Sequence, residues 1–256
     1  MVTIKKPEEI ATIRKGGKIL AEVLNEIIKI SKPGVTTIKI DQLAEKLITE
    51  KGGIPSFKNY RSHSGETPFP STICASVNEQ LVHTPASNYK LQDGDILTID
   101  IGMKYPAKDG FFTDMAITIP IGNIPSETQK LIEVTKESLN KGISQIKEGN
   151  KLSDISRAIQ DYVEGQGFSV VRQLVGHGVG YEVHEDPRIP NYVDSKYQDL
   201  VLKAGMVLAI EPMVNVGNPA VKSDGWTIVT DDGKLCAHFE HTVAVTKDGF
   251  KILTLP

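Results

Sequence analysis

The chain has 256 residues, of which 39% are hydrophobic and 24% are charged, and its formal net charge at pH 7 is -3. This length suits one large domain or two small ones, and the composition is ordinary for a globular protein in water. Because the chain is slightly acidic, it lacks the basic balance with which proteins hold nucleic-acid phosphates, and no stable nucleic-acid partner is expected. Brief docking to a charged assembly stays open.

The N-terminal residues and the cysteine count predict a location. The segment Met1–Glu9 contains no apolar run like that of a signal peptide, and no segment approaches the roughly 18 consecutive apolar residues of a membrane-spanning helix. The two cysteines, Cys74 and Cys236, are too few for the disulfide framework of a small secreted domain. We therefore expect a cytoplasmic protein without membrane attachment, in which both thiols are buried.

Four amphipathic helices are predicted, in two pairs of similar design. They cover residues 7–30, 40–48, 126–146 and 155–163. Lys-Pro-Gly at 32–34 separates the first two helices, and Lys-Glu-Gly at 147–149 separates the second two. At the start of the third helix, Ser126 and Gln129 have the spacing of a capping box.

A strand pattern also occurs twice. In each case a glycine turn leads into a short apolar run that ends in a carboxylate, Asp100 in the first and Glu211 in the second. One such match arises by chance, because turn-plus-strand segments look alike. Two helices and a strand repeated in the same order favour an internal duplication instead, with halves of roughly 1–122 and 123–256 in a single domain over 1–256. Matching ends of two such units meet near a pseudo-twofold axis, so the two acids are expected to face each other.

Four carboxylates lie on or beside apolar segments. Asp100 ends the apolar run 96–99, and Asp114 follows a Gly-Phe-Phe-Thr turn. An aspartate at a strand end is usually a solvated turn residue, but Glu211 and Glu240 are flanked by apolar residues, where an unpaired carboxylate is costly. Because no lysine or arginine is an immediate neighbour of these two glutamates, another positive partner is expected.

Two histidines follow in a segment that is rich in glycine. His177 lies within Gly-His-Gly-Val-Gly, and His184 lies within Val-His-Glu-Asp-Pro. Each alone is more commonly a structural residue. Seven positions apart, the two would point to opposite faces of an ideal strand. They reach one site only if the glycines bend the chain, or if one of them acts through another residue.

One imidazole and four carboxylates together make an oxygen-rich set of metal ligands. The set is Asp100, Asp114, His177, Glu211 and Glu240. At an effective dielectric constant near 20, two carboxylates about 4 Å apart repel by roughly 4 kcal/mol, so a cluster of them requires cations. Two divalent ions would cancel the charge of the four carboxylates. A set with one imidazole and no thiolate suits manganese, iron or cobalt, and zinc is also compatible with it.

The order and context of these residues resemble type I methionine aminopeptidase, over nearly the whole chain. The matching segments are Ile-Asp at 99–100, Phe-Thr-Asp at 112–114, Gly-His-Gly-Val-Gly at 176–180, His-Glu-Asp-Pro at 184–187, Ile-Glu-Pro-Met at 210–213 and Phe-Glu-His-Thr at 239–242. Further matches are Ser-Val-Asn-Glu at 76–79 with His83, and Asp-Gly-Trp-Thr at 224–227. No single segment is specific, but their combination is. The resemblance implies the pita-bread fold, an α+β architecture in which helices back a curved antiparallel sheet built from two similar halves.

The resemblance also implies a reaction, the hydrolysis of the N-terminal methionine from nascent proteins that have a small second residue. By this resemblance, Asp100 would chelate one metal ion, His177 and Glu211 would chelate the other, and Asp114 and Glu240 would bridge both. Water or hydroxide between the ions would attack the scissile amide, and the residue at position 211 would also handle the proton.

Further residues match the family's substrate contacts. His83 and His184 would lie beside the substrate, one contacting the scissile amide and the other stabilising developing charge. The pocket for the methionine side chain would be lined by Tyr60, Phe69, Cys74, Val183 and Trp226. Aromatic and sulfur-containing neighbours suit a polarizable thioether. Plain core packing would also explain each of these residues, and for Val183 alone it is the preferred explanation.

The chain departs from the family's usual pattern near this pocket. Residues 62–68 form an insertion, within which His63 is expected to be a solvated loop residue, and residues 104–107 are expected to form an extra turn. Thr84 stands where many relatives have glycine, and Val183 stands where phenylalanine or methionine is common. These changes bear on substrate preference and rate, and they leave every proposed metal ligand in place.

Three functions are weighed. Removal of the initiator methionine by a cytoplasmic monomer, with transient ribosome contact, accounts for all the matching residues. A prolidase or aminopeptidase P usually has an additional N-terminal domain and further histidines near the metals. A non-catalytic binding protein of the same fold would have lost metal ligands, whereas this chain has all five. The lack of a long helical insertion and of a zinc-binding extension favours the short bacterial form.

Overall fold

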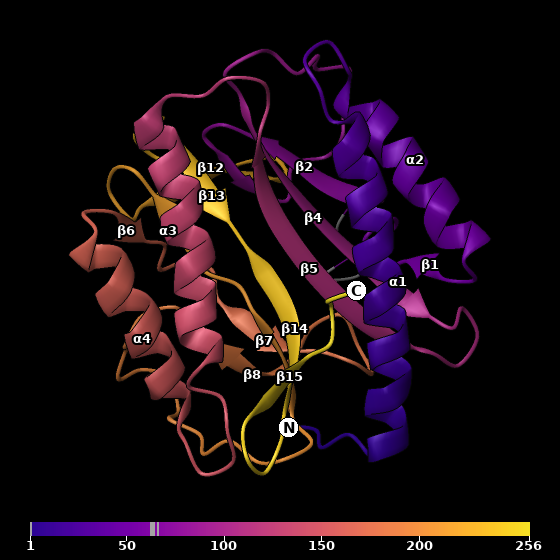
Figure 1. The fold of residues 1–256 in the computed structure, drawn as a ribbon, viewed down its shortest axis with the longest axis vertical. Coiled ribbons are helices and arrows are strands. Elements are labelled where there is room, and N and C mark those ends of the chain that lie inside the picture. The colour runs from indigo at the N-terminus through magenta and orange to yellow at the C-terminus, as the bar shows by residue number, and fades with distance from the viewer. Residues whose placement is uncertain (1, 62–64, 66) are drawn as a thin grey trace.

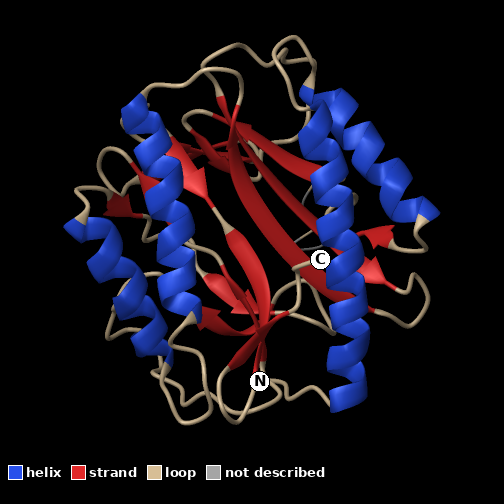
Figure 2. Cartoon of the chain, viewed as in Figure 1, coloured by secondary structure: helices blue, strands red, loops and turns tan. Residues whose placement is uncertain are grey.

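The computed structural model describes residues 2–61, 65 and 67–256. In this part of the chain, four helices lie in front of one large curved sheet, two over each half of it (Figure 1). The helices are α1 (Pro7–Ile30), α2 (Thr37–Glu50), α3 (Ser126–Ile143) and α4 (Leu152–Gly165). Figure 2 shows α1 and α2 along one side of the view and α3 and α4 along the other, with the strands between and behind them.

The amphipathic pattern predicted all four helices, and for α1 it predicted both ends. The backbone N–H of Lys6 donates to Glu9 Oε2 at 2.7 Å, which satisfies a donor that the helix itself leaves unpaired. The capping box predicted at Ser126 is wrong. Pro125 is the N-cap of α3 and forms no side-chain cap hydrogen bond, because its ring sets the extended entry to the helix and Ser126 is already helical.

The large sheet is antiparallel and combines strands from both ends of the chain. Its order is β1 (Ile54–Pro55), β4 (Ile96–Tyr105), β5 (Phe111–Pro120), β14 (Glu240–Val245), β9 (Val207–Ile210), β7 (Gly176–Gly178) and β8 (Glu185–Ile189), with β2 (Ile73–Val77) beside β4 and β15 (Phe250–Ile252) beside β14. The pairing of β5 with β14 joins the two halves. The arrangement agrees with the expected two-part fold, while the duplication of 1–122 as 123–256 stays a prediction.

Two three-stranded sheets accompany the large one. The first contains β13 (Cys236–His238), β10 (Met213–Asn215) and β6 (Ser169–Val170), and the second contains β11 (Val221–Asp224), β12 (Thr227–Thr230) and β3 (Gln80–Val82). The turn between β11 and β12 carries Trp226, next to Gly225, whose φ of 62° is a conformation that favours glycine.

The longest hairpin, β4 with β5, differs from the prediction in three respects: the end of the first strand, the position of Asp114, and the length of the turn at 104–107. Asp100 does not end its strand, because β4 continues to Tyr105, and Asp114 lies inside β5 rather than after a turn. The expected extra turn at 104–107 is shorter than predicted, since Lys104 pairs with Phe112 within the hairpin. Ile99 and Ile101 pack against α1 and α2, so the alternation of a strand directs the carboxylate between them to the opposite face.

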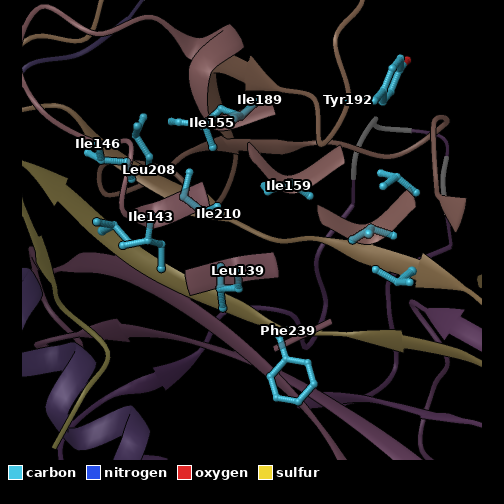
Figure 3. Packing of buried hydrophobic residues seen from close by; sticks show 14 of the residues in the cluster. Leu139, Ile143, Ile146, Ile155, Ile159, Ile189, Tyr192, Leu208, Ile210 and Phe239 are labelled. Atoms are coloured by element: carbon cyan, nitrogen blue, oxygen red, sulfur yellow. The ribbon is translucent and has the colours of Figure 1, made fainter. Parts of the chain in front are cut away.

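Two apolar clusters hold the helices on the sheet. One lies under α1 and α2, and the other lies under α3 and α4 (Figure 3). In the second, Leu139 of α3 and Ile159 of α4 pack with Leu208 and Ile210 of β9, and all four are at most 2% exposed. At roughly 1.5–3 kcal/mol for each fully buried side chain of this size, such a cluster fixes the strand from which Glu211 emerges.

Three remaining expectations concern membrane-spanning helices, the insertion at 62–68 and the two cysteines. Among the described segments, no helix combines the length and the apolar character that a membrane crossing requires. The predicted insertion at 62–68 lies largely outside the described residues, and His63 is one of those left out. Cys74 and Cys236 are both buried and unpaired, as the sequence predicts.

Candidate metal centre and active site

The five predicted ligands lie on or directly after five consecutive strands of the large sheet. Asp100 is on β4, Asp114 on β5, Glu240 on β14, Glu211 directly after β9, and His177 on β7. The strand registers bring the five residues to the same level of the sheet. Each residue lies within two positions of a residue that pairs across to the neighbouring strand. Residues that are far apart in the sequence are therefore brought together, as predicted.

The ligand atoms of three of these residues lie close enough to share one ion. One ligand atom each from Asp114, His177 and Glu240 lie within 4.8 Å of one another. His177 Nε2 lies 3.4 Å from Glu211 Oε1, which extends the cluster toward β9. Asp100 joins it from the neighbouring strand, because β4 pairs with β5, and burial together with the charge of Asp100 raises the pKa of Asp114.

The electrostatics of the cluster fit a site for cations. Burial raises the pKa of Asp100 to about 7, and burial followed by repulsion from the neighbouring acids raises the pKa of the other three carboxyls well above their usual range. Buried oxygens of Asp100, Asp114 and Glu240 have no hydrogen-bond partner. Among the described lysines and arginines, none forms an ion pair with these acids. Divalent ions are the partners that such a set lacks.

His177 is prepared to act as a ligand. Its Nδ1 lies 2.9 Å from the carbonyl oxygen of Gly178. A carbonyl only accepts, so Nδ1 carries the hydrogen and the lone pair of Nε2 is left to face Glu211. Burial lowers the pKa of His177 to about 4, so the ring is neutral at physiological pH, as metal binding requires. A hydrogen bond from the other ring nitrogen is typical of histidines that bind metals.

Comparison with known proteins agrees with this reading of the site. Residues 11–247 match the model of metallopeptidase family M24. The chain belongs to metallopeptidase family M24. It is 52% identical to methionine aminopeptidase 1 of Bacillus subtilis (strain 168) over 256 residues, or 99% of each chain. The methionine aminopeptidase structures from Rickettsia prowazekii and Thermotoga maritima match it with TM-scores of 0.93 and 0.92 at 39% and 42% identity, each over 100% of both chains.

These matches confirm two predictions from the sequence. The resemblance to methionine aminopeptidases holds over the whole length, and the curved antiparallel sheet backed by four helices is the pita-bread fold of those solved structures. The chain is accordingly a member of a family of metal-dependent hydrolases, as expected.

A cavity of about 440 Å³ opens at this cluster of four carboxylates and His177, which line part of it. Four of the five predicted pocket residues line it, namely Tyr60, Phe69, Cys74 and Trp226. Phe69 and Trp226 meet edge to face, with ring centroids 5.4 Å apart. Val183 does not line the cavity but packs in the same apolar cluster as Phe69 and Cys74, so it supports the wall from behind. The structure thus makes this pocket from aromatic, aliphatic and thiol groups.

The two histidines of the glycine-rich segment meet in this cavity. A turn joins β7 to β8, and it contains Gly180, whose φ is 139°. The turn reverses the chain, so His184 returns beside His177 with ring centroids 4.5 Å apart. Of the two ways in which both histidines could reach one site, the structure shows the first, in which glycine bends the chain. His184 Nδ1 also lies 2.8 Å from the hydroxyl of Tyr60, and burial lowers the pKa of His184 to about 3.

His83 lines the same cavity, in a left-handed backbone conformation with φ of 57°. Such a conformation is costly for a residue with a side chain, and it persists where the surroundings impose it. The next residue supplies that constraint. The carbonyl of Thr84 accepts from the Ala75 N–H at 2.8 Å, and its hydroxyl accepts from Ser76 at 3.0 Å. Thr84 thus anchors His83.

His238 is the site residue that reading the sequence missed. It ends β13, is 1% exposed, lines the cavity, and places Nε2 3.8 Å from Glu211 Oε2. Neither ring nitrogen has a hydrogen-bond partner, and burial lowers the pKa of His238 to about 3. A signal was available, because a residue two positions before Glu240 shares its face on a strand.

Proposed function

We propose that this M24 chain hydrolyses the N-terminal methionine from polypeptides that have a small second residue. The observation that carries the proposal is the juxtaposition of a buried cluster of four carboxylates and His177 with an aromatic pocket, in one cavity of about 440 Å³. A volume of this size suits a short N-terminal segment rather than a folded substrate. The relatives from Bacillus subtilis and Clostridium perfringens, at 52% and 50% identity over whole chains, are methionine aminopeptidases by name.

The proposed cofactors are two divalent metal ions, with manganese, iron or cobalt favoured by the donor set and zinc compatible with it. Asp100 would hold one ion, His177 and Glu211 the other, and Asp114 and Glu240 would contact both. The unpartnered buried oxygens and the neutral imidazole support this division. When bound, such ions lower the pKa of water and polarise the scissile carbonyl.

The remaining steps belong to side chains of this chain. Glu211 would take the proton from the attacking water and deliver it to the departing amine, since its carboxylate faces His177 on one side and His238 on the other. The Tyr60 hydroxyl would donate to His184 Nδ1, which leaves the hydrogen on Nε2. That N–H would then stabilise the negative charge developing on the carbonyl oxygen. His83, which lines the same cavity, would contact the scissile amide.

Selectivity for methionine would follow from the pocket. Phe69 and Trp226 present ring edges and faces, and the buried thiol of Cys74 adds a second polarizable group. Burial, followed by the charge of Asp100, raises the pKa of Cys74 well above its usual range, so the thiol stays neutral and serves as an apolar contact. A thioether gains dispersion energy against such groups, whereas a branched leucine side chain fills the pocket less well.

We also propose the setting of the reaction. A cytoplasmic monomer would act on nascent chains, with transient ribosome contact and no stable binding of nucleic acid or membrane. The two buried cysteines, both free, agree with a reducing compartment. The formal net charge of -3 agrees with the lack of a lasting nucleic-acid partner.

Peptide cleavage tests the proposal most directly. Purified protein is stripped with a chelator, reloaded with manganese or cobalt, and supplied separately with Met-Ala-Ser, Leu-Ala-Ser and an Ala-Pro peptide. We expect cleavage of the methionine peptide at the highest kcat/KM, slower cleavage of the leucine peptide, and no comparable cleavage of Ala-Pro. Equal rates on methionine and leucine would remove the specificity while sparing the chemistry, and preference for Ala-Pro would indicate the prolidase type of activity.

A further inference from the structure

The N-terminal strap, which comprises residues 2–5, lies against the turn that connects β7 to β8. The ammonium group of Lys5 lies 2.6 Å from Glu185 Oε2, and the two side chains are only 1% and 6% exposed. The backbone N–H of Lys5 donates to the carbonyl of Gly205 at 2.8 Å, which fixes the strap to the sheet. Burial lowers the pKa of Lys5, in keeping with the cost of desolvating both charges. Stability alone is therefore a weak reason for this ion pair.

The carboxylate of Glu185 joins the strap to the turn. On one side, Oε2 accepts from Lys5 and from the hydroxyl of Thr3. On the other side, Oε1 accepts from the backbone N–H groups of Tyr181 and Glu182, at 2.5 and 3.1 Å. Two backbone donors of the turn and two side chains of the strap thus meet on a single carboxylate, so a displacement of the strap is transmitted to the turn.

The stem of Lys5 also packs on the turn. A Cβ on Gly180 would come within 2.7 Å of Lys5 Cε, so the lysine fills the space that only a glycine leaves open. The carbonyl of Gly180 accepts from the Phe112 N–H at 2.7 Å, which ties the start of the turn to β5. The Tyr181 hydroxyl donates to Glu9 of α1 at 2.8 Å, while the Lys5 ammonium lies 5.2 Å from the tyrosine ring centroid.

The turn carries two residues of the active site. Val183 packs with Phe69 in the apolar cluster behind the pocket, and His184 is the immediate neighbour of Glu185. The ring of His184 has a hydrogen-bond distance of 2.8 Å to Tyr60 and an edge contact with His177. A small rotation of the turn would therefore move His184 relative to the metal cluster.

We infer that Lys5 is a positioning residue, which through its buried ion pair with Glu185 fixes the turn that presents His184 to the substrate and holds Val183 in the apolar cluster behind the pocket. The inference rests on the proposed function, because that function gives His184 its role in stabilising the charge that develops on the carbonyl oxygen. An ion pair that only stabilised the fold would change the melting temperature and leave the turnover of folded protein unaltered.

Substitution of the pair separates these two roles. Lys5→Met keeps the stem and removes the charge, and Glu185→Gln keeps Oε1 as an acceptor for the turn. Lys51→Met is the matched control, since it breaks an ion pair of 2.7 Å with Glu22 on the helical side of the molecule.

kcat and KM are measured with Met-Ala-Ser well below the melting temperature of every variant. We expect Lys5→Met to lower kcat by about tenfold or more, with KM within about threefold, because a misplaced catalytic group slows the chemical step. The control should be unchanged.

The double variant Lys5→Met/Glu185→Gln provides the rescue. It leaves no buried charge unpaired, and the amide oxygen introduced at position 185 still accepts from the turn, so we expect kcat above that of Lys5→Met alone. If Lys5→Met does not fold, Thr3→Val takes its place, since it removes one donor to Glu185 and leaves the ion pair intact; we expect about a threefold loss of kcat. Unchanged kcat in the folded variants, with lowered melting temperatures, would overturn the inference.

A measurement that needs no activity completes the test. The ring signals of His184 in metal-free protein are assigned by their loss in His184→Gln, and they are compared between variants by nitrogen-proton correlation spectra. We expect them to move in Lys5→Met and to stay in place in Lys51→Met. If the wild-type protein cleaves no peptide but these signals move, the proposed function fails and the positioning stands. If peptides are cleaved and the signals stay in place, the positioning inference fails alone.

Discussion

Glu240 pairs with Ala116 across the junction of β5 and β14, so its side chain lies on the same face as that of Asp114, two residues along β5. The two acids belong to strands from opposite halves of the chain, and both are buried in one cluster with His177. Cations bound there would therefore join the two halves of the sheet as well as serve the reaction. Metal content should change stability as well as rate.

The raised pKa values of the four buried carboxyls are expected to lower the stability of the metal-free protein as pH rises from about 4.5 through 7. Burial raises the pKa of Asp100 to about 7, and those of the other three carboxyls lie well above their usual range. In this window the folded carboxyls hold protons that the unfolded chain has released, so their contribution to the free energy of unfolding decreases with pH. The lowered pKa values of His177, His184, His238 and His241 act in the opposite sense below about pH 6.5. Bound cations take the place of those protons, so their stabilising effect should grow over the same window.

Melting temperatures with and without manganese, after treatment with a chelator, check this expectation between about pH 5 and about pH 8. The increment due to manganese should increase at each step of pH in the wild type. In Asp114→Asn it should shrink, because one ligand and one titrating group are lost together. An increment that is large and independent of pH would contradict the cluster as the metal site. Glu137→Gln on the exposed face of α3 serves as the control.

Glu211→Gln is expected to abolish detectable turnover, with kcat lower by at least about 10²–10⁴-fold. The substitution removes the proposed base and weakens one metal site at once, since Glu211 Oε1 lies 3.4 Å from His177 Nε2. Calorimetric titration of metal separates the two effects, because a variant that still binds two ions but does not turn over has lost only the base. Full activity in this variant would show that the role assigned to Glu211 is wrong. Glu182→Gln, an exposed acid near the cavity, is the matched control.

The sequence was sufficient to single out these five residues because their local environments are unusual. Glu211 and Glu240 stand out as acids within apolar runs, and the structure brings the five side chains to one cavity, while their roles as ligands stay a prediction. The extent of β4 and β5 was missed, since the hairpin partner that prolongs a strand is not visible in either strand alone. The contact of Lys5 with Glu185 was missed for the same reason, because it joins residues 180 positions apart.

Trp226→Leu is expected to reduce selectivity for methionine more than it reduces the chemistry. The indole meets Phe69 edge to face and lies on the turn between β11 and β12, whereas the proposed metal ligands lie on or directly after strands of the large sheet. Loss of this wall removes contacts to the thioether, which raises KM for Met-Ala-Ser by about 3–30-fold and lowers the preference over Leu-Ala-Ser. Metal affinity should be unchanged. Steady-state kinetics on both peptides measure the ratio, and a ratio equal to that of the wild type would show that Trp226 is only a packing residue.

His238→Phe is expected to stabilise the protein and slow it. The imidazole is 1% exposed and both of its nitrogens are unpartnered, so replacement by an apolar ring removes a buried polar cost of about 1 kcal/mol or more. The same change removes the ring nitrogen that lies 3.8 Å from Glu211 Oε2, and should lower kcat by about tenfold as the base loses its orientation. His238→Gln, which keeps a donor, should retain more activity and gain less stability. Chemical denaturation and kcat on Met-Ala-Ser measure both quantities. A variant that is less stable than the wild type would mean that His238 has a partner in solution, such as an ordered water, which the phenylalanine displaces.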